Sequence, residues 1–378
     1  MKVMTVVGTR PEIIRLSRVI HRLDTTEGIE HVLVHTGQNY DYTLNQIFFK
    51  DLGLRQPDHI LGIDTTSVGA VLGGTLVGAE RVMLTERPDA VLVLGDTNSC
   101  IAALMARRLK IPTYHMEAGN RSFDSNVPEE INRKLVDHVA DFNLVYTEHA
   151  RRNLLAEGLH PRRIIKTGSP MFEVLNAYRE KIVTSDILID KGLTEREYFL
   201  VSAHREENVD SPDRLRLLLE CLLAVRNEFR KLIFVSTHPR TRKRLEELPN
   251  WSEPDGIVFS EPLGFHDYNR LQLSAACCLS DSGTIAEEAS ILGFPAVTLR
   301  DSIERPEALD TGRIIMSGLN SEDLLMAIRI SMNSVTSSRS AAVDSVPMDY
   351  KIGNASERAV NFILSTAHRH HQWEGIRV

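Results

Sequence analysis

The sequence predicts an α/β protein built from two Rossmann-like domains. Three observations support this fold class. Short apolar runs alternate with longer segments whose apolar residues recur at helical spacing, which is typical of βαβ units. Nearly every apolar run ends in small turn-forming and polar residues. The pattern also restarts after Gly168, and a chain of 378 residues suits two domains of about 150–200 residues each.

The first domain is predicted over 1–168. Strands are expected at its apolar runs, which are Val3–Val7, His31–His35, Ala90–Leu94, Thr113–His115 and Phe142–Tyr146. Apolar residues follow the first run at helical spacing, and 100–109 is also predicted to be helical. Strands that alternate with helices favour a parallel sheet.

The second domain is predicted over 169–353. Its expected strands are Tyr198–Ser202, Leu232–Ser236, Ala275–Leu279 and Ala296–Leu299. The Ser-rich stretch 335–350 is predicted to be a surface loop. A last helix is expected at about 354–370, and its residues alone do not say which domain it joins. The tail His368–His371 is expected to be frayed and solvated.

The composition excludes several classes of protein. A net charge of −7 and a pI of about 6.1 argue against general nucleic-acid binding, which usually requires a basic surplus. No apolar run of about 18 residues predicts a membrane span, and the N-terminus has no signal-peptide core. The four cysteines form no C-x-x-C pair, so neither disulfides nor a zinc site are expected. These features together predict a cytoplasmic protein.

Acidic residues follow strands in the first half. Asp96 and Glu117 each come directly after an apolar run, and Glu129 and Glu130 follow Pro128 at a predicted helix start. Helix capping explains Asp96 equally well, and acids in a first helical turn explain the glutamate pair. If these carboxylates share one site, they suit general acid and base catalysis.

Cationic side chains follow other strands and suggest a site for a pyrophosphate. These are Arg10, Arg15, His204, Arg205, His238, Arg240 and Arg305. The segment 281–288 (DSGTIAEE) reads as a strand end, a turn of small residues and a helix start, whose amides suit a phosphate. The sequence has neither a G-x-G-x-x-G after a strand nor a P-loop, so a dinucleotide dehydrogenase and a P-loop NTPase are not favoured.

Seven ordered motifs resemble the non-hydrolysing UDP-N-acetylglucosamine 2-epimerase family, over residues 1 to about 330. The motifs are GTRPE (8–12), GDT (95–97), HMEAGNR (115–121), PEEINR (128–133), HREEN (204–208), DSG with EE (281–283, 287–288) and ERPE (304–307).

The resemblance implies a glycosyltransferase-B-like fold, with two Rossmann-like domains facing across a cleft and a C-terminal helix that crosses back to the first. It implies a homodimer that acts on a UDP-linked 2-acetamido sugar. The reaction would eliminate UDP to give a 2-acetamidoglucal and then add UDP back with inverted C2. No cofactor and no metal ion would be needed.

The resemblance also implies roles for single residues. Asp96, Glu117 and Glu129 match the catalytic carboxylates, and His204 matches the histidine on the pyrophosphate side. The matched binding residues and the further cations and acids expected in the site are Arg10, Arg15, Glu130, Arg133, Arg205, His238, Tyr268, Ser282, Gly283, Thr284, Glu288 and Arg305. Glu288 would bind ribose, and Tyr268, with Phe265 as the alternative, would flank the uracil.

Four departures from the usual family pattern point to a subgroup. Arg15 stands where lysine is usual, Asn120 replaces leucine, and Thr284 replaces a second glycine. The stretch HTGQNYDY at 35–42 replaces one that helps to bind an allosteric UDP-sugar in some members. The sequence is similar to C2 epimerases that form UDP-N-acetyl-L-fucosamine for capsule or O-antigen. Interconversion of UDP-GlcNAc and UDP-ManNAc is the alternative.

Three other functions remain to be weighed. A glycosyltransferase of this fold would share the phosphate turn but would need no carboxylates around C2. A hydrolysing relative would release UDP and a free sugar. A nucleotide-sugar sensor would have no need of the catalytic carboxylates. Asp96, Glu117 and Glu129 therefore favour the epimerase.

Overall fold

The computed structural model describes residues 1–37, 46–124, 127–249, 251–302, 304–337 and 346–377. The chain forms two compact units. The first unit is Met1–Ala177 with Lys351–Val378, and the second unit is Tyr178–Tyr350. The boundary thus lies after Ala177 rather than after Gly168. The difference arises because helix α7 (Met171–Ala177) packs against helix α1 (Arg10–Thr25) of the first unit.

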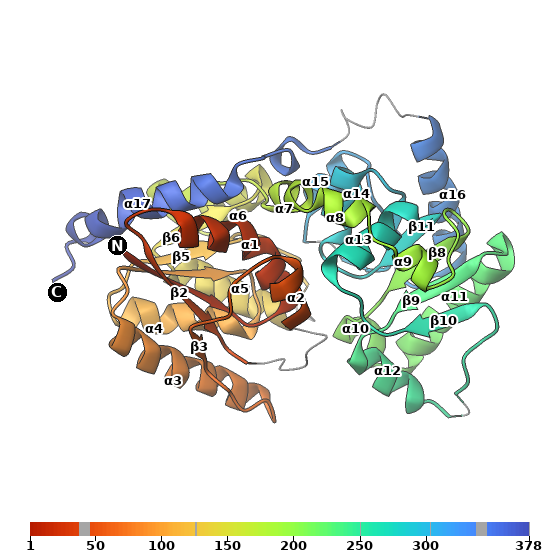
Figure 1. Cartoon of the computed structure of the whole chain (residues 1–378), viewed down its shortest axis with the longest axis horizontal. Coiled ribbons are helices and arrows are strands. Elements are labelled where there is room, and N and C mark those ends of the chain that lie inside the picture. Colours follow the sequence, from red (N-terminus) through yellow and green to blue (C-terminus); the bar gives the residue numbers. More distant parts are fainter. Residues whose placement is uncertain (38–45, 125–126, 250, 303, 338–345, 378) are drawn as a thin grey trace. The chain divides into compact units, whose positions relative to one another are not determined.

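The first unit contains a seven-stranded parallel sheet in the order β3-β2-β1-β4-β5-β6-β7 (Figure 1). Its strands are β1 (Lys2–Val7), β2 (Glu30–His35), β3 (His59–Ile60), β4 (Ala90–Leu94), β5 (Thr113–Met116), β6 (Phe142–Val145) and β7 (Ile164–Lys166). The chain runs outward from β1 in one direction and then from β4 in the other, which makes the sheet doubly wound.

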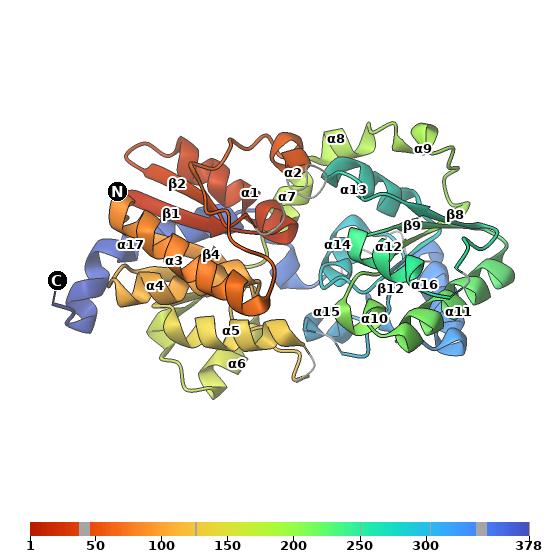
Figure 2. The ribbon, with the colours of Figure 1, turned by 90° about the horizontal axis from the view of Figure 1, so that it is seen from below.

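Helices cover both faces of this sheet. Besides α1 and α7 they are α2 (Gln46–Asp51), α3 (Val68–Glu86), η2 (Asn98–Ile101), α4 (Ala102–Arg108), α5 (Pro128–Val139), α6 (Glu148–Ala156), η3 (Pro161–Arg163) and α17 (Ala355–Glu374). Helices α1 and α17 lie together on one face, and α3 and α4 lie side by side on the other (Figures 1 and 2). Side chains of successive β1 residues point to opposite faces of the sheet. Met4 and Val6 point to the same face and pack in the apolar cluster under α3 and α4.

The second unit repeats this architecture with six parallel strands in the order β10-β9-β8-β11-β12-β13. The strands are β8 (Tyr198–Ser202), β9 (Leu232–Ser236), β10 (Ile257–Ser260), β11 (Cys277–Ser280), β12 (Ala296–Thr298) and β13 (Ile315–Met316). The helices are α8 (Arg179–Val183), α9 (Ile187–Asp190), α10 (Glu206–Val209), α11 (Pro212–Phe229), α12 (Pro239–Glu246), α13 (Phe265–Ser274), α14 (Ile285–Leu292), α15 (Pro306–Asp310), α16 (Ser321–Ser337) and η4 (Met348–Tyr350).

Two apolar clusters hold the helices of the second unit to its sheet. Phe199 and Val201 of β8 face the cluster that includes α11 and α16, whereas Tyr198 and Leu200 face the cluster that includes α13 and α14. All five residues of β9 and the four of β11 are buried or half-buried. Two apolar faces are expected of a parallel sheet covered on both sides, and they explain the continuous apolar runs in the sequence.

Four strands were not predicted from the sequence, and each of them lies at an edge of its sheet. They are β3, β7, β10 and β13. Each pairs with one neighbour only, and β3 and β13 have two residues each. An edge strand is not enclosed on both sides, so it needs no long apolar run. The Ser-rich loop expected at 335–350 begins inside α16, and its residues 338–345 lie outside the described part of the chain.

Helix α3 is the one helix among the described residues that is long and apolar enough to cross a membrane. Only 33% of its most apolar stretch is buried. Gly74 and Gly78 let the helix lie close to the chain that precedes it, because a Cβ added at Gly74 would meet Ile63 at 3.1 Å. A side chain added at Gly78 would meet Leu61 at 3.0 Å. Because α3 also packs on α4, it has the contacts of a layer helix.

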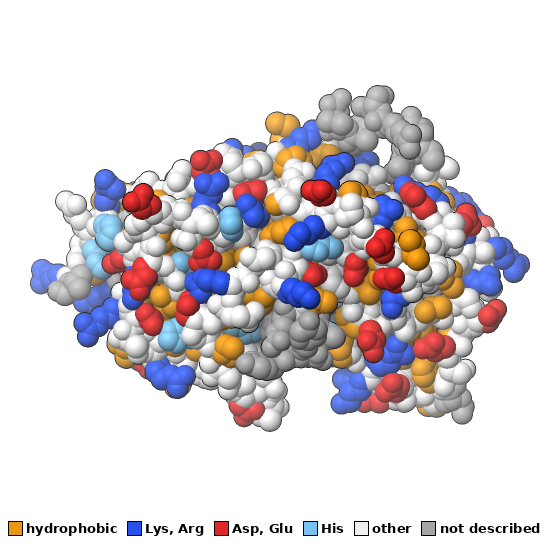
Figure 3. All heavy atoms as spheres, viewed as in Figure 1, with side chains coloured by type: hydrophobic (Ala, Val, Ile, Leu, Met, Phe, Trp, Pro, Cys, Tyr) orange, Lys and Arg blue, Asp and Glu red, His pale blue; other side chains and the backbone are white. Residues whose placement is uncertain are grey.

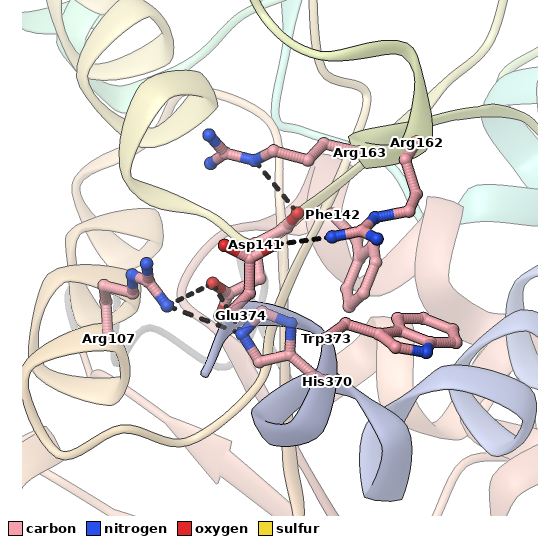
Figure 4. Close-up of a pocket in the computed structure, with 8 residues that line it drawn as sticks. All are labelled: Arg107, Asp141, Phe142, Arg162, Arg163, His370, Trp373 and Glu374. Atoms are coloured by element: carbon pink, nitrogen blue, oxygen red, sulfur yellow. Dashed lines mark hydrogen bonds and ion pairs between the residues drawn. The ribbon is translucent and has the colours of Figure 1, made fainter. Parts of the chain in front are cut away.

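The C-terminal tail is not frayed, which corrects the expectation from the sequence. Helix α17 continues to Glu374, and His370 is 3% exposed. Figure 4 shows the reason: His370 and Arg107 both meet the carboxylate of Asp141, the former at 3.0 Å. Arg162 stacks over Trp373 and pairs with Glu374 at 3.0 Å. These residues line a small pocket in which the charged groups pair with one another. The pairs anchor the end of α17 to the first unit.

Asp141→Asn should loosen this anchor. The other oxygen of this carboxylate accepts the amide N–H of Thr113 at 3.0 Å, so the NH₂ group of asparagine would face either that donor or Arg107 and His370. Breaking a buried ion pair by removing one partner costs several kcal/mol, and the partly exposed Arg107 reduces this to about 2–3 kcal/mol. We expect a lower midpoint of urea unfolding for the first unit. An unchanged midpoint would mean that α17 is held by its apolar contacts alone.

The surface agrees with the charge balance of the sequence. On the face drawn in Figure 3, cationic and anionic side chains are interspersed over both units. A nucleic-acid-binding face would instead gather lysine and arginine. All four cysteines are buried free thiols, and burial raises the pKa of Cys277 to about 12, which keeps it protonated and unreactive.

Candidate active site

Two strand ends bring Asp96 and Glu117 to the same edge of the first sheet. Strands β4 and β5 pair in parallel with Leu94 opposite Met116, so the residues that follow them meet beyond the carboxyl ends. Asp96 lies in the turn after β4, with 19% of its side chain exposed, and Glu117 is 3% exposed. The sequence predicted both positions, and the contacts described next join the two residues in one cluster.

Arg133 links these two carboxylates. Its guanidinium is 2% exposed and pairs with the Asp96 carboxylate. It also lies 3.5 Å from the Glu117 carboxylate and donates to the Glu117 carbonyl at 2.6 Å. Arg15 of α1 pairs with the other oxygen of Glu117. The two guanidinium groups, from α1 and α5, thus hold the Glu117 carboxylate from two sides.

The backbone at Glu117 adopts a conformation that is uncommon for a residue with a side chain. Its φ is 62°, in the left-handed region, and Gly119 follows at 80°. Holding a non-glycine residue there costs about 1–3 kcal/mol, so the surroundings must enforce it. At Gly119 a Cβ would lie 2.4 Å from the carbonyl of Ala150, which explains the glycine. Such enforced backbone strain is common at functional sites.

Helix α5 carries the glutamate pair, and the structure separates the two residues. Glu130 is 7% exposed and accepts from the amide and hydroxyl of Ser122 at 2.7 and 2.8 Å. Burial would raise the pKa of Glu130, but these bonds and Lys134 outweigh it and lower that pKa. Glu130 thus fixes the loop before α5. Glu129 is half-buried and lies one turn before Arg133 on the same helical face.

Arg10 and Glu12 begin helix α1 beyond strand β1. Arg10 is half-buried, and its guanidinium lies over the ring of Phe48 at 5.7 Å. Glu12 is fully buried and accepts from Gly8 N at 3.1 Å, from Thr9 Oγ1 at 2.8 Å and from Ser99 Oγ. Burial raises the pKa of Glu12 despite these bonds. Glu12 therefore ties the turn before Arg10 to the turn that contains Asp96.

In the second unit, Asp281 organises the turn that carries His204 and Arg205. This carboxylate is fully buried after β11 and accepts the amide N–H groups of both residues at 3.0–3.1 Å. It also lies 3.5 Å from His204 Nδ1. The His204 side chain is 34% exposed and stacks on His238 at 5.7 Å. The contact of Nδ1 with Asp281 orients the His204 ring beyond the end of strand β8.

The predicted phosphate turn follows Asp281. Ser282 Oγ bonds Thr284 Oγ1 at 2.9 Å, and helix α14 begins after Thr284. Gly283 lies close to Arg205, where a Cβ would meet the guanidinium at 3.4 Å. A pocket opens beside this turn and is lined by Ser282, Gly283, Ile285, Ala286, Thr298, Arg300, Glu304 and Arg305. Cations beside a helix start form a suitable site for an anion.

Buried ion pairs hold the arginines around this pocket. Arg305 pairs with the fully buried Glu287 at 2.5 Å, and Arg300 pairs with Glu304 at 3.0 Å. Glu304 also lies 3.6 Å from Arg205. Glu287 was expected with Glu288 as a possible acceptor from ribose hydroxyls, whereas the sequence assigned no role to Arg300 and Glu304. The sequence does show acids and arginines close together around 287 and 300–305, which indicates ion pairs in this region. The spacing alone does not say which of these residues pair.

The remaining predicted binding residues lie nearby in the second unit. Glu288 is half-buried and accepts from Gln272 at 2.6 Å. Tyr268 is half-buried on α13, whereas Phe265 is 4% exposed and packs edge-on against Tyr178. Tyr268 is thus the more accessible of the two proposed uracil neighbours. Of the atypical stretch 35–42, residues 38–42 lie outside the described part of the chain.

Known proteins share much of this sequence. The family model for UDP-N-acetylglucosamine 2-epimerase matches residues 21–364. The UDP-N-acetylglucosamine 2-epimerase of Methanocaldococcus jannaschii is 40% identical over 340 residues, which cover 88% of this chain and 93% of the relative.

Solved structures extend the likeness to the fold. The structure of UDP-N-acetylglucosamine 2-epimerase from Rickettsia bellii is 45% identical, with a TM-score of 0.90 and 98% of each chain covered. The Methanocaldococcus jannaschii enzyme, solved in complex with UDP-GlcNAc and UDP, is 37% identical, with a TM-score of 0.88. The match covers 97% of this chain and all (100%) of that one.

Proposed function

Because this chain belongs to the UDP-N-acetylglucosamine 2-epimerase family, we propose that it inverts C2 of UDP-GlcNAc by eliminating UDP and adding it back. The observation that carries the proposal is the cluster of Asp96 and Glu117 around Arg133 and Arg15. A C2 proton beside an acetamido group is not acidic, so its removal needs a positioned base and a departing group.

The reaction has two mirror-related halves. In the first, a carboxylate takes the C2 proton, the C1–O bond breaks, and the electron pair leaves with the β-phosphate oxygen as C1 and C2 become doubly bonded. In the second, another carboxylate gives a proton to the opposite face of C2, and the phosphate oxygen adds back to C1. The carboxylates of Asp96, Glu117 and Glu129 are the proposed acids and bases.

The second unit is proposed to bind the leaving group. UDP carries its charge on the diphosphate, and the turn at Ser282 lies beside Arg205 and Arg305. Cations that stabilise a departing diphosphate lower the barrier to C–O cleavage. His204 Nε2 is proposed to donate to the phosphate oxygen, with its ring oriented by Asp281. Glu288 and Tyr268 are proposed to contact ribose and uracil.

Proton NMR in D₂O tests this function. With UDP-GlcNAc and no acceptor sugar, the purified enzyme should introduce deuterium at C2 and produce a second anomeric signal. A glycosyltransferase would leave C2 protonated. A hydrolase would instead accumulate free sugar and UDP at the rate of conversion.

A second substrate is favoured by the departures at Arg15, Asn120 and Thr284. We propose UDP-N-acetyl-L-fucosamine, a product used in capsule or O-antigen synthesis, as the alternative to UDP-GlcNAc. Asn120 is 5% exposed and lies three residues after Glu117, and we propose that it affects recognition of the sugar ring rather than the C2 chemistry. Deuterium exchange at C2 with the L-sugar, and not with UDP-GlcNAc, would select this substrate.

We also propose that the enzyme is a homodimer. Helix α3 exposes Val77 and Leu84, with exposed fractions of 69% and 57%. The two residues are seven positions apart and lie on the same face of the helix, and burial of this face against a second copy would be favourable. Light scattering should give twice the chain mass of 42.5 kDa.

A further inference from the structure

A second buried carboxylate, Asp137, lies behind the turn that carries Glu117. It belongs to α5 and is fully buried. Its oxygens meet His115 Nδ1 at 2.9 Å and Arg121 NH1 at 2.7 Å, and they accept the amide N–H of Gly119 at 3.1–3.2 Å. Asp137 therefore holds residues on both sides of Glu117, two before it and two and four after it.

The strained backbone at Glu117 needs such a clamp. Residues 117 and 119 both have positive φ, at 62° and 80°. The chain reverses between them, and Asp137 ties the reversed amide of Gly119 to the strand residue His115. A non-glycine residue stays in the left-handed region only where its surroundings over-determine it. The contacts of Asp137 supply this constraint within seven residues of chain.

His115 extends the clamp to the other catalytic turn. Its ring is fully buried, and its Nε2 lies 2.7 Å from the carbonyl oxygen of Gly95, the residue before Asp96. The two ring nitrogens of His115 therefore face two different partners, the Asp137 carboxylate and the Gly95 carbonyl. The ring thus joins Asp137 to the turn of Asp96, where Gly95 has a φ of 71°.

The charges around Asp137 keep it ionised. Burial alone would raise the pKa of Asp137, but the hydrogen bond from His115 and the positive charges of His115 and Arg121 outweigh burial and lower it. Arg121 is in turn paired with Glu157 through two nitrogens, at 2.8 and 2.7 Å.

We propose that Asp137, acting through His115, is the positioning residue that fixes Glu117 and Asp96 relative to each other for proton transfer at C2. This inference rests on the proposed function. Asp137 does not meet the substrate. It acts on the orientation of two groups whose misplacement by about 1 Å can cost about 100-fold in rate.

Asp137→Asn tests the proposal, with Asp141→Asn as the matched control. Both aspartates are buried, accept a backbone N–H and meet one arginine and one histidine. Only Asp137 lies behind Glu117. We expect Asp137→Asn to lower kcat for C2 exchange about 100-fold while the KM for UDP-GlcNAc stays within about twofold. Asp141→Asn should lose stability and keep its kcat.

His115→Gln is a second variant that tests the same proposal if Asp137→Asn does not fold. It leaves the ion pair of Asp137 with Arg121 and removes the link to Gly95. A fall in kcat of about 10-fold with unchanged KM is expected, because one turn is released instead of two. A KM increase with normal kcat in either variant would overturn the positioning role.

A crystal structure of Asp137→Asn gives a readout that does not depend on activity. The proposal predicts that Glu117 leaves the left-handed region and that its carboxylate moves away from Arg133. An unchanged Glu117 would overturn the proposal even if kcat fell. If the wild-type protein shows no C2 exchange, the proposed function fails, and this structure still decides whether Asp137 positions Glu117.

Discussion

Glu117→Gln should abolish most of the turnover, with kcat reduced by about 10²–10⁴-fold, the range for loss of one acid or base. Glutamine preserves the size of the side chain but cannot take a proton from C2. It also leaves Arg15 and Arg133 without the negative charge that both now face. The measurement is the rate of deuterium entry at C2 of UDP-GlcNAc in D₂O.

The control for Glu117→Gln is Glu86→Gln. Glu86 is a half-buried carboxylate that, like Glu117, pairs with a cation, Lys2 at 3.1 Å, but it ends helix α3 beside the amino ends of the strands. It should exchange deuterium at the wild-type rate. Near-normal exchange by Glu117→Gln would remove Glu117 from proton transfer and leave it a structural partner of the two arginines.

Glu129→Gln should have an effect of similar size. Glu129 lies in the first turn of α5, four residues before Arg133, which contacts both Asp96 and Glu117. This spacing directs Glu129 along the same helical face as the cluster. Loss of a second proton-transfer group should lower kcat by about 10²–10⁴-fold. Conversion followed by NMR under saturating UDP-GlcNAc measures it.

The alternative role of Glu129 is to stabilise the start of its helix, and Glu148→Gln isolates that role. Glu148 occupies the first turn of α6, where it also faces the positive end of a helix. Such contacts are worth about 0.3–1 kcal/mol. If Glu129→Gln changes only the unfolding midpoint, by as much as Glu148→Gln does, then Glu129 is a helix-capping acid and the catalytic assignment fails.

The interior strands could be predicted from sequence because each is enclosed on both faces. Runs such as Ala90–Leu94 and Tyr198–Ser202 coincide with β4 and β8. Burial on both faces leaves no room for polar side chains, so the pattern is visible locally. The turns that follow these strands could be predicted for the same reason, and they carry Asp96 and His204.

Edge strands and the end of α17 could not be predicted in this way. The edge strand β3 has one neighbour and only two residues, so its run is too short to read. His370 looks like part of a polar tail. It is buried because it packs against Asp141 and Arg107. Both partners lie more than 200 residues away along the chain. The residues around His370 therefore do not indicate that it has these distant partners.

The sequence by itself determined the two-domain α/β architecture, the strand ends that carry polar residues, and the family. Tertiary structure alone decided which charges pair. Glu130 turns to Ser122, Glu12 joins two turns, and Asp137 stands behind Glu117. The physical reason is range. Apolar periodicity reports burial residue by residue, whereas an ion pair depends on two segments that meet only when the sheet has formed and its strand ends lie side by side.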